Sequence, residues 1–229
     1  MGEVILKIEN GTKKFKNELI FQNVSMEFEK GNSYGFVGPN GCGKSVFFKT
    51  LCGYSLLTEG QVIYRGKIIG KEQDFIDDAG IVIEEPEFIN SLSGLENLKI
   101  LAEIQKKISE AEIIEVLKQF DLYEDRNKKV GKYSVGMKQK LRLAQAVMEK
   151  PQVLILDEPM NGLDKKSVKK VEDILKAFVE NGGTLLMTSH IEQQVEACCK
   201  IVYEIDGGEI LRVTEGELAP VSCLQTDAS

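Results

Sequence analysis

The stretch "GPNGCGKS", residues 38–45, combines three glycines with a lysine and a hydroxyl at its end. The apolar run "YGFV" precedes it and the apolar run "VFF" follows it, so we expect a strand before it and a helix after it. The pattern Gly-x-x-x-x-Gly-Lys-Ser in this setting is typical of a phosphate-binding loop. Its glycines let backbone N–H groups turn toward an anion, and the helix N-terminus adds the positive end of its dipole. The alternative interpretation is a plain glycine-rich turn before a helix.

The phosphate-binding interpretation gives each polar group of this stretch a role. Lys44 would reach the outer phosphates of a triphosphate, and Ser45 would be a ligand of Mg²⁺. Cys42 would be sensitive to oxidation only if the loop favoured its thiolate; a small residue in a loop is the simpler interpretation. The residues expected to contact the nucleotide here are Gly38, Pro39, Asn40, Gly41, Cys42, Gly43, Lys44, Ser45 and Val46.

A second stretch, "VLILDEP" at residues 153–159, supplies carboxylates that a magnesium nucleotide needs. Its four apolar residues predict a buried strand, with Asp157 and Glu158 at the carboxyl end. Ligands of open parallel sheets bind beyond the carboxyl ends of the strands, so this end should face the phosphate-binding loop. Asp157 would hold Mg²⁺ directly or through water, and Glu158 would orient or deprotonate the attacking water. An acidic start of a helix after a strand is the alternative.

Apolar periodicity predicts an α/β protein. Short uninterrupted apolar runs bounded by turn residues predict a mainly parallel core sheet that is covered on both faces. These runs are "YGFV" (34–37), "IVI" (81–83), "VLIL" (153–156), "TLLMT" (184–188) and "KIVYEI" (200–205). Near the start, apolar residues at 24, 26 and 28 alternate with polar ones, which predicts an N-terminal antiparallel β subdomain.

The middle of the chain has a helical pattern instead. Apolar residues recur at helical spacing over residues 95–120. Ser93 with Glu96 and Ser109 with Glu112 have the spacing of capping boxes, so we expect a helix to begin after each serine. The sequence therefore predicts an α-helical subdomain inserted between two strands of the core sheet.

Composition limits the classes of function. The 229 residues carry a net charge of -7, which argues against a protein that coats nucleic acid. No apolar run is long enough to span a bilayer, and the N-terminus lacks the pattern of a secretion signal. Five cysteines without CxxC spacing and a single histidine favour reduced thiols over disulfides or a zinc site. We therefore expect a cytoplasmic protein.

The stretch "YSVGMKQK", residues 133–140, completes a set of motifs that resembles the nucleotide-binding domain of ABC transporters. The order is a phosphate-binding loop, a helical insertion, a Ser-x-Gly motif and then Asp-Glu. Ser134 and Gly136 match the serine and second glycine of the family signature. The resemblance covers residues 1–212, with the helical subdomain at about 87–150 and a C-terminal tail at 213–229. It implies a P-loop NTPase fold of the ABC type.

The resemblance assigns further residues. It implies that Phe15 stacks on adenine, although aromatic residues are common in strands. It implies that His190 contacts the γ-phosphate and acts with Lys44 and Glu158 in catalysis, although a lone histidine is more often structural. "NGLD", residues 161–164, resembles the loop that touches a facing subunit. Glu84 occupies the position of the family's glutamine, where its carboxylate would ligate Mg²⁺.

The departures from the family pattern indicate a subgroup. Val135 and Met137 replace a glycine and a glutamine of the signature, and Val46 replaces a hydroxyl. With "IEEPEFINSLSGLENL" at 83–98, they resemble ATPases of bacterial exporters for bacitracin, lantibiotics and related peptides. This resemblance implies ATP and Mg²⁺ as cofactors, a second nucleotide-binding domain across a shared ATP site, and a separate transmembrane permease. It implies no nucleic acid partner, and it places the chain on the inner face of the cell membrane.

Other classes of function remain open at this point. A soluble ABC-type ATPase of translation or DNA repair usually carries two cassettes or a long coiled coil, and an importer ATPase would share most motifs. A GTPase would read guanine with Asn-Lys-x-Asp, but "NKKV" at 127–130 ends in valine. A small-molecule kinase would need an arginine-rich lid, and this chain is poor in arginine.

Overall fold

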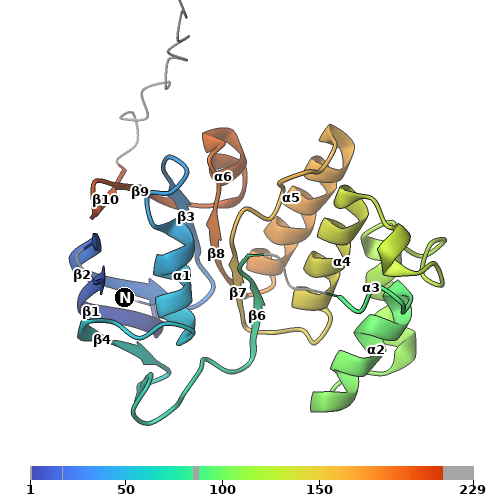
Figure 1. Cartoon of the computed structure of the whole chain (residues 1–229), viewed down its shortest axis with the longest axis horizontal. Coiled ribbons are helices and arrows are strands. Elements are labelled where there is room, and N and C mark those ends of the chain that lie inside the picture. Colours follow the sequence, from blue (N-terminus) through green and yellow to red (C-terminus); the bar gives the residue numbers. More distant parts are fainter. Residues whose placement is uncertain (1, 17, 85–87, 214–229) are drawn as a thin grey trace, which may run out of the picture.

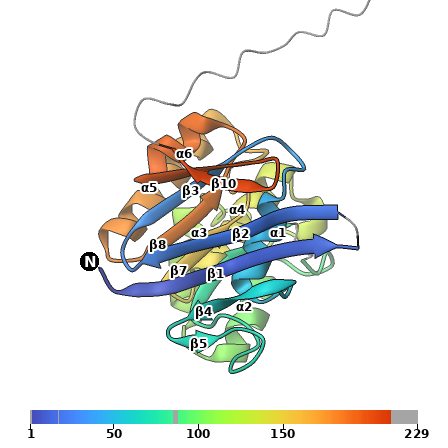
Figure 2. The ribbon, with the colours of Figure 1, turned by 90° about the vertical axis from the view of Figure 1, so that its left-hand side faces the viewer.

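The computed structural model describes residues 2–16, 18–84 and 88–213, which form two sheets with helices around them (Figure 1). The first sheet is antiparallel, with the strand order β2-β1-β4-β5. Its strands are β1 (Val4–Phe15), β2 (Glu18–Glu29), β4 (Glu59–Tyr64) and β5 (Lys67–Ile68). The two long strands β1 and β2 lie side by side in Figure 2. The predicted N-terminal antiparallel subdomain is confirmed.

The second sheet carries the site. Its order is β10-β9-β3-β8-β7-β6, and all neighbours except the β9–β10 pair are parallel. Its strands are β3 (Ser33–Val37), β6 (Ala79–Val82), β7 (Val153–Leu156), β8 (Thr184–Thr188), β9 (Ile201–Asp206) and β10 (Glu209–Arg212). The predicted mainly parallel core sheet is confirmed. The predicted strands at 81–83 and 200–205 are shifted by one or two residues.

Both faces of this sheet are covered, which explains the uninterrupted apolar runs. Along β7, Val153 and Ile155 pack into one hydrophobic cluster, whereas Leu154 and Leu156 pack into the other. The first cluster contains the buried side of α1 (Lys44–Cys52) and the antiparallel sheet. The second contains residues of α4 (Val135–Val147), α5 (Lys165–Glu180) and α6 (Glu192–Cys198). Figure 1 shows α1 on one side of β6–β8 and α4 and α5 on the other.

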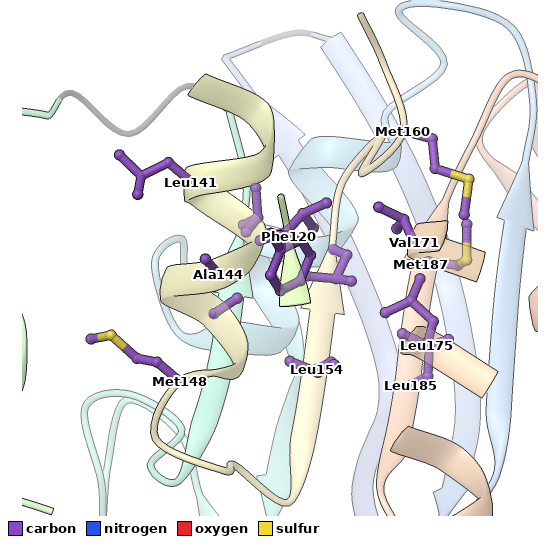
Figure 3. Close-up of a cluster of buried hydrophobic side chains, with 14 of the residues drawn as sticks. Phe120, Leu141, Ala144, Met148, Leu154, Met160, Val171, Leu175, Leu185 and Met187 are labelled. Atoms are coloured by element: carbon purple, nitrogen blue, oxygen red, sulfur yellow. The ribbon is translucent and has the colours of Figure 1, made fainter. Parts of the chain in front are cut away.

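The second cluster attaches the helical insertion to the core sheet. Figure 3 shows α4 beside β7, with Leu154 on the strand and Leu141 on the side of the helix away from it; all belong to this cluster together with Ala144. Leu175 of α5 and Leu185 of β8 extend the same cluster, and all five side chains are buried. Burying such a side chain stabilises the fold by about 1.5–3 kcal/mol. This packing therefore fixes α4 against β7, the strand that is followed by Asp157 and Glu158.

Aromatic packing fixes the phosphate-binding loop on the other face. Phe36 of β3 contacts Phe47 and Phe48 of α1, with ring centroids 5.3 Å and 5.4 Å away. Tyr203 of β9 stacks on Phe36 at 5.4 Å. Such contacts add to the burial of the rings and fix their geometry. The loop between β3 and α1 thus connects two elements that are held together at its base.

The helical insertion begins with α2 (Gly94–Gln105) and α3 (Glu110–Gln119), followed by the short 3-10 turn η1 (Val130–Lys132). Both predicted capping boxes are present, at Ser93 and at Ser109. Within the described ranges, no helix combines the length and apolarity needed to cross a membrane. Of the predicted tail, residues 214–229 lie outside the described residues.

Candidate nucleotide-binding site

The loop between β3 and α1 has a backbone that requires glycine at two positions. Gly38 has φ 151°, and a Cβ atom there would lie 2.3 Å from the carbonyl oxygen of Ile205. Gly43 has φ 105°, and its Cβ would lie 2.6 Å from Cγ2 of Ile20. Gly43 caps α1 without a side-chain hydrogen bond. The N-terminus of α1 therefore keeps its positive end open toward the loop, which suits an anion.

The remaining residues of the loop differ in exposure. Pro39, Asn40 and Gly41 are exposed, whereas Cys42 and Val46 are half-buried. A Cβ at Gly41 would meet no atom within 4 Å, so the loop leaves open space on this side. Burial raises the pKa of the Cys42 thiol, and the nearby Lys44 charge opposes this effect less strongly. The thiolate is not favoured, so the condition for a redox-sensitive Cys42 is not met.

Lys44 lies inside the loop instead of in solvent. Its side chain is 6% exposed, and its Nζ donates to the carbonyl oxygens of Gly38 at 2.8 Å and Pro39 at 3.0 Å. The same Nζ lies 3.9 Å from Oε1 of Glu158. A buried ammonium group is costly unless it is paired, so these contacts hold it in position without a phosphate.

Ser45, Asp157 and Thr188 form a hydrogen-bonded group at the carboxyl ends of the strands. Ser45 Oγ donates to Asp157 Oδ2 at 2.5 Å, and Thr188 Oγ1 donates to Asp157 Oδ1 at 2.6 Å. Thr188 Oγ1 also accepts from the backbone N–H of Glu158 at 2.9 Å. We did not predict Thr188 from the sequence. Its position at the end of a parallel strand, two residues before His190, was the available signal.

Ser45 and Asp157 fit a magnesium ion that arrives with a nucleotide. Mg²⁺ prefers oxygen ligands and is usually held by one or two carboxylates, substrate phosphates and water. Among the residues that the structure describes, no group of three His, Cys, Asp or Glu side chains forms a site for a metal alone. The hydroxyl and the carboxylate thus supply part of a coordination shell that phosphate oxygens would complete.

Glu158 and His190 meet beside the end of Lys44. His190 Nδ1 lies 2.9 Å from Glu158 Oε2, while Oε1 of Glu158 is buried without a hydrogen-bond partner. The Glu158 backbone is left-handed, with φ 48°, which is uncommon for this residue type and occurs mainly where the surroundings enforce it. One carboxylate oxygen is therefore fixed by the histidine, and the other is an acceptor suited to water.

The signature residues begin α4 and touch the loop at residues 161–164. Ser134 caps the helix by accepting from the Met137 N–H at 3.2 Å. A Cβ at Gly136 would lie 3.2 Å from the carbonyl oxygen of Gly162, so the two segments lie close together. Val135, which lies between Ser134 and Gly136 in the sequence, is 70% exposed. The helices α4 and α1 belong to the clusters on opposite faces of the sheet.

A buried amide links α4 to the segment that follows β7. Gln139 Nε2 donates to the carbonyl oxygen of Pro159 at 2.8 Å, and Arg142 NH1 donates to Gln139 Oε1 at 3.0 Å. Both side chains are buried. We did not predict either residue from the sequence, because a polar residue inside a helix carries no local signal of a contact with a distant loop.

Two residues assigned by resemblance have other partners in the structure. Phe15 is at the end of β1, is 47% exposed and has Lys13 Nζ 4.5 Å from its ring centroid. Glu84 follows β6 and pairs with Lys49 of α1, instead of with Ser45 or Asp157.

The fold and the site define a P-loop ATP hydrolase with an inserted helical subdomain. The family described as ABC transporter matches residues 21–161, which is more than half of the chain. The chain belongs to the ABC transporter family, as predicted.

Characterised and uncharacterised relatives support this assignment. The uncharacterised ABC transporter ATP-binding protein YybJ of Bacillus subtilis is 37% identical over 206 residues, covering 90% of this chain and 94% of that protein. The lantibiotic transport ATP-binding protein SrtF of Streptococcus pyogenes is 34% identical, covering 90% and 89%. The bacitracin transport ATP-binding protein BcrA of Enterococcus faecalis is 32% identical, covering 91% and 68%. The predicted likeness to bacitracin and lantibiotic ATPases is confirmed.

Solved structures match the fold. The dimeric ATP-binding cassette MJ0796, in a post-hydrolysis state with ADP and Pi, has a TM-score of 0.81 and 23% identity. The alignment covers 92% of this chain and 99% of that chain. At this identity the likeness concerns the fold, and it agrees with the ABC-type P-loop architecture predicted from the sequence.

Proposed function

We propose that this chain hydrolyses Mg²⁺·ATP to power a separate membrane permease that exports a peptide antibiotic or a similar compound. The observation that carries the hydrolysis is the convergence of Lys44, Ser45, Asp157, Glu158 and His190 at one edge of the sheet. The names of SrtF and BcrA support the class of cargo. Phosphate release from ATP by the purified chain tests the hydrolysis, and transport by membranes that also contain the permease tests the coupling.

The geometry supports a role for each side chain. The Lys44 ammonium would exchange its carbonyl partners for phosphate oxygens, while the helix N-terminus holds the phosphates by backbone N–H groups. Glu158 would take the proton of the attacking water at Oε1, and His190 would fix the carboxylate through Oε2. Ser45 and Asp157 would hold Mg²⁺, which would supply positive charge against the phosphate oxygens.

Two copies of the chain would share each ATP. Ser134 and Gly136 of one chain would cover the phosphate-binding loop of the other, because α1 and α4 pack on opposite faces of the sheet. Closure would exclude water and place fixed dipoles where charge develops. This arrangement supports a homodimer, and the face of the partner copy would complete the site.

Mixing two inactive variants tests the shared site. Lys44→Ala removes the loop cation, and Gly136→Asp places a carboxylate in the signature. If the signature acts across the dimer, a mixed dimer keeps one intact site, so an equimolar mixture should regain about a quarter of the wild-type ATPase rate. This fraction assumes random pairing and independent sites. If the signature served its own chain, the mixture would stay as inactive as either variant alone.

Exposed apolar residues beside the helical insertion are the proposed docking surface for the permease. We define the docking surface as Tyr54, Phe75, Ile100 and Ile104, which are all exposed. Tyr54 and Phe75 form a ring pair with centroids 5.7 Å apart, and Tyr54 and Ile104 line one cavity of about 220 Å³. Exposed apolar groups of this kind mark interaction sites.

The loop "IEEPEF" at residues 83–88, next to the helical insertion, is a further candidate for docking, but residues 85–87 lie outside the described residues. Phe88 is partly buried against the second cluster, which favours subdomain packing as its main role.

Substituting Ile104 tests the docking surface. Ile104 is 75% exposed, so Ile104→Asp should leave folding and the basal ATPase rate unchanged, because no buried contact is lost. It should reduce co-purification with the permease by roughly tenfold, since a charge would enter an apolar contact. Leu211→Asp is the matched control, because Leu211 is 61% exposed on β10. Equal losses for both variants would contradict this surface.

Stimulation of the ATPase by ribosomes or DNA, without stimulation by permease-containing membranes, would overturn the transport function.

A further inference from the structure

Lys49 and Glu84 form an ion pair that the proposed mechanism does not use. Lys49 lies in the last turn of α1, four residues after Ser45, so the two side chains share one side of the helix. Glu84 is the second residue after β6, has a left-handed backbone with φ 61°, and bonds through Oε1 to Lys49 Nζ. The pair therefore lies at the side of α1 that carries the metal-binding hydroxyl.

The sheet also brings Glu84 toward the phosphate end of the site. Strand β6 is the parallel neighbour of β7, and the Asp157 N–H donates to the carbonyl oxygen of Val82 at 2.7 Å. Glu84 follows Val82 by two residues, just as Glu158 follows Leu156 on the adjacent strand. A third carboxylate thus lies at an edge that already holds Asp157 and Glu158.

A negative charge at this edge opposes the binding of a triphosphate. The repulsion between like charges at a protein surface falls when a counter-ion is close. Lys49 is the cation that contacts Glu84 in this structure, while Lys44 is held inside the loop by Gly38 and Pro39.

We infer that Lys49 neutralises Glu84 and thereby sets the affinity of the site for ATP, without contacting the nucleotide. This inference rests on the proposed binding of ATP at the phosphate-binding loop. It makes Lys49 a positioning residue, whose importance depends on the carboxylate at position 84. Removing the cation alone leaves the Glu84 charge unpaired near the carboxyl ends of β6 and β7, whereas removing both charges leaves no unpaired charge at these two positions.

A double-mutant cycle tests this dependence by ATP binding, with no need for turnover. The dissociation constant of a non-hydrolysable ATP analogue with Mg²⁺ would be measured by calorimetry for wild type, Lys49→Gln, Glu84→Gln and the double variant. We expect Lys49→Gln to weaken binding by roughly threefold to tenfold, Glu84→Gln to bind at least as tightly as wild type, and the double variant to bind within about twofold of Glu84→Gln. Lys49→Arg should bind like wild type, because it keeps the charge.

The salt dependence of binding and the double variant distinguish an indirect effect of the Lys49 charge from a direct contact between Lys49 and the nucleotide. The loss in Lys49→Gln should shrink when the ionic strength rises from about 0.05 M to 0.5 M, as expected for screened charges. An equal loss when Lys49→Gln is made in the Glu84→Gln chain would mean that Lys49 contacts the nucleotide itself, and it would overturn the inference. Unchanged binding by Lys49→Gln would also overturn it. If wild type failed to bind the analogue at all, the proposed function would fail instead.

Discussion

Lys44→Ala should lower kcat/KM for ATP hydrolysis by roughly a thousandfold or more. The reason is the position of the ammonium group, which is buried in the loop and held by the carbonyl oxygens of Gly38 and Pro39. With nucleotide bound, the ammonium group would pair with the phosphates. In a site with little water, such an ion pair is much stronger than in bulk solvent. Phosphate release and nucleotide binding would be measured on the same preparation.

The control for this variant is a lysine outside the site. Lys150 is exposed just after α4 and pairs with Glu112, so Lys150→Ala removes one charge without touching the loop. Thermal denaturation would establish that both variants are folded. If Lys44→Ala hydrolysed ATP at more than about a tenth of the wild-type rate, the proposed role of Lys44 in hydrolysis would be wrong.

Glu158→Gln is the second large effect. We expect it to lower kcat by roughly 10²–10⁴-fold, the usual contribution of a positioned general base. The amide keeps the size of the side chain but cannot accept the proton of water at the position of the buried Oε1. ATP binding should persist, because Lys44, Ser45 and Asp157 are unchanged, and the removal of a negative charge favours the bound triphosphate.

This variant should also accumulate as an ATP-bound dimer. Light scattering after gel filtration with Mg²⁺ and ATP would report the mass, and the wild type would return to monomer as ATP is consumed. Glu149→Gln is the matched control, because Glu149 is a half-buried glutamate outside the site, near the end of α4. If Glu158→Gln hydrolysed ATP at the wild-type rate, Glu158 would not be the base.

The elements with strong local signals were predictable. The glycine positions of the phosphate-binding loop, the two capping boxes and the apolar strand runs each follow from short-range chemistry. The meeting of Ser45 and Asp157 also follows from a general rule, because ligands of open parallel sheets bind beyond the carboxyl ends of the strands, where the segments after β3 and β7 both lie.

The contacts that depend on tertiary packing were not predictable. Thr188 bridges Asp157 and Glu158, and Lys49 pairs with Glu84 across 35 positions of the chain. Neither pairing has a local sequence signal, since a threonine at the end of a strand and a lysine on a helix occur in many settings. Here the fold decides which side chains meet.

The hydrogen bond from Gln139 to Pro159 has a mechanical consequence. It joins the middle of α4 to the main chain next to Glu158, the proposed general base, and both ends are buried. Any tilt of the helical insertion would therefore be expected to shift Glu158, which we propose activates water. A movement of the permease that tilts α4 would thus be transmitted to Glu158 through this hydrogen bond. The rate of ATP hydrolysis would then follow the conformational cycle of the permease.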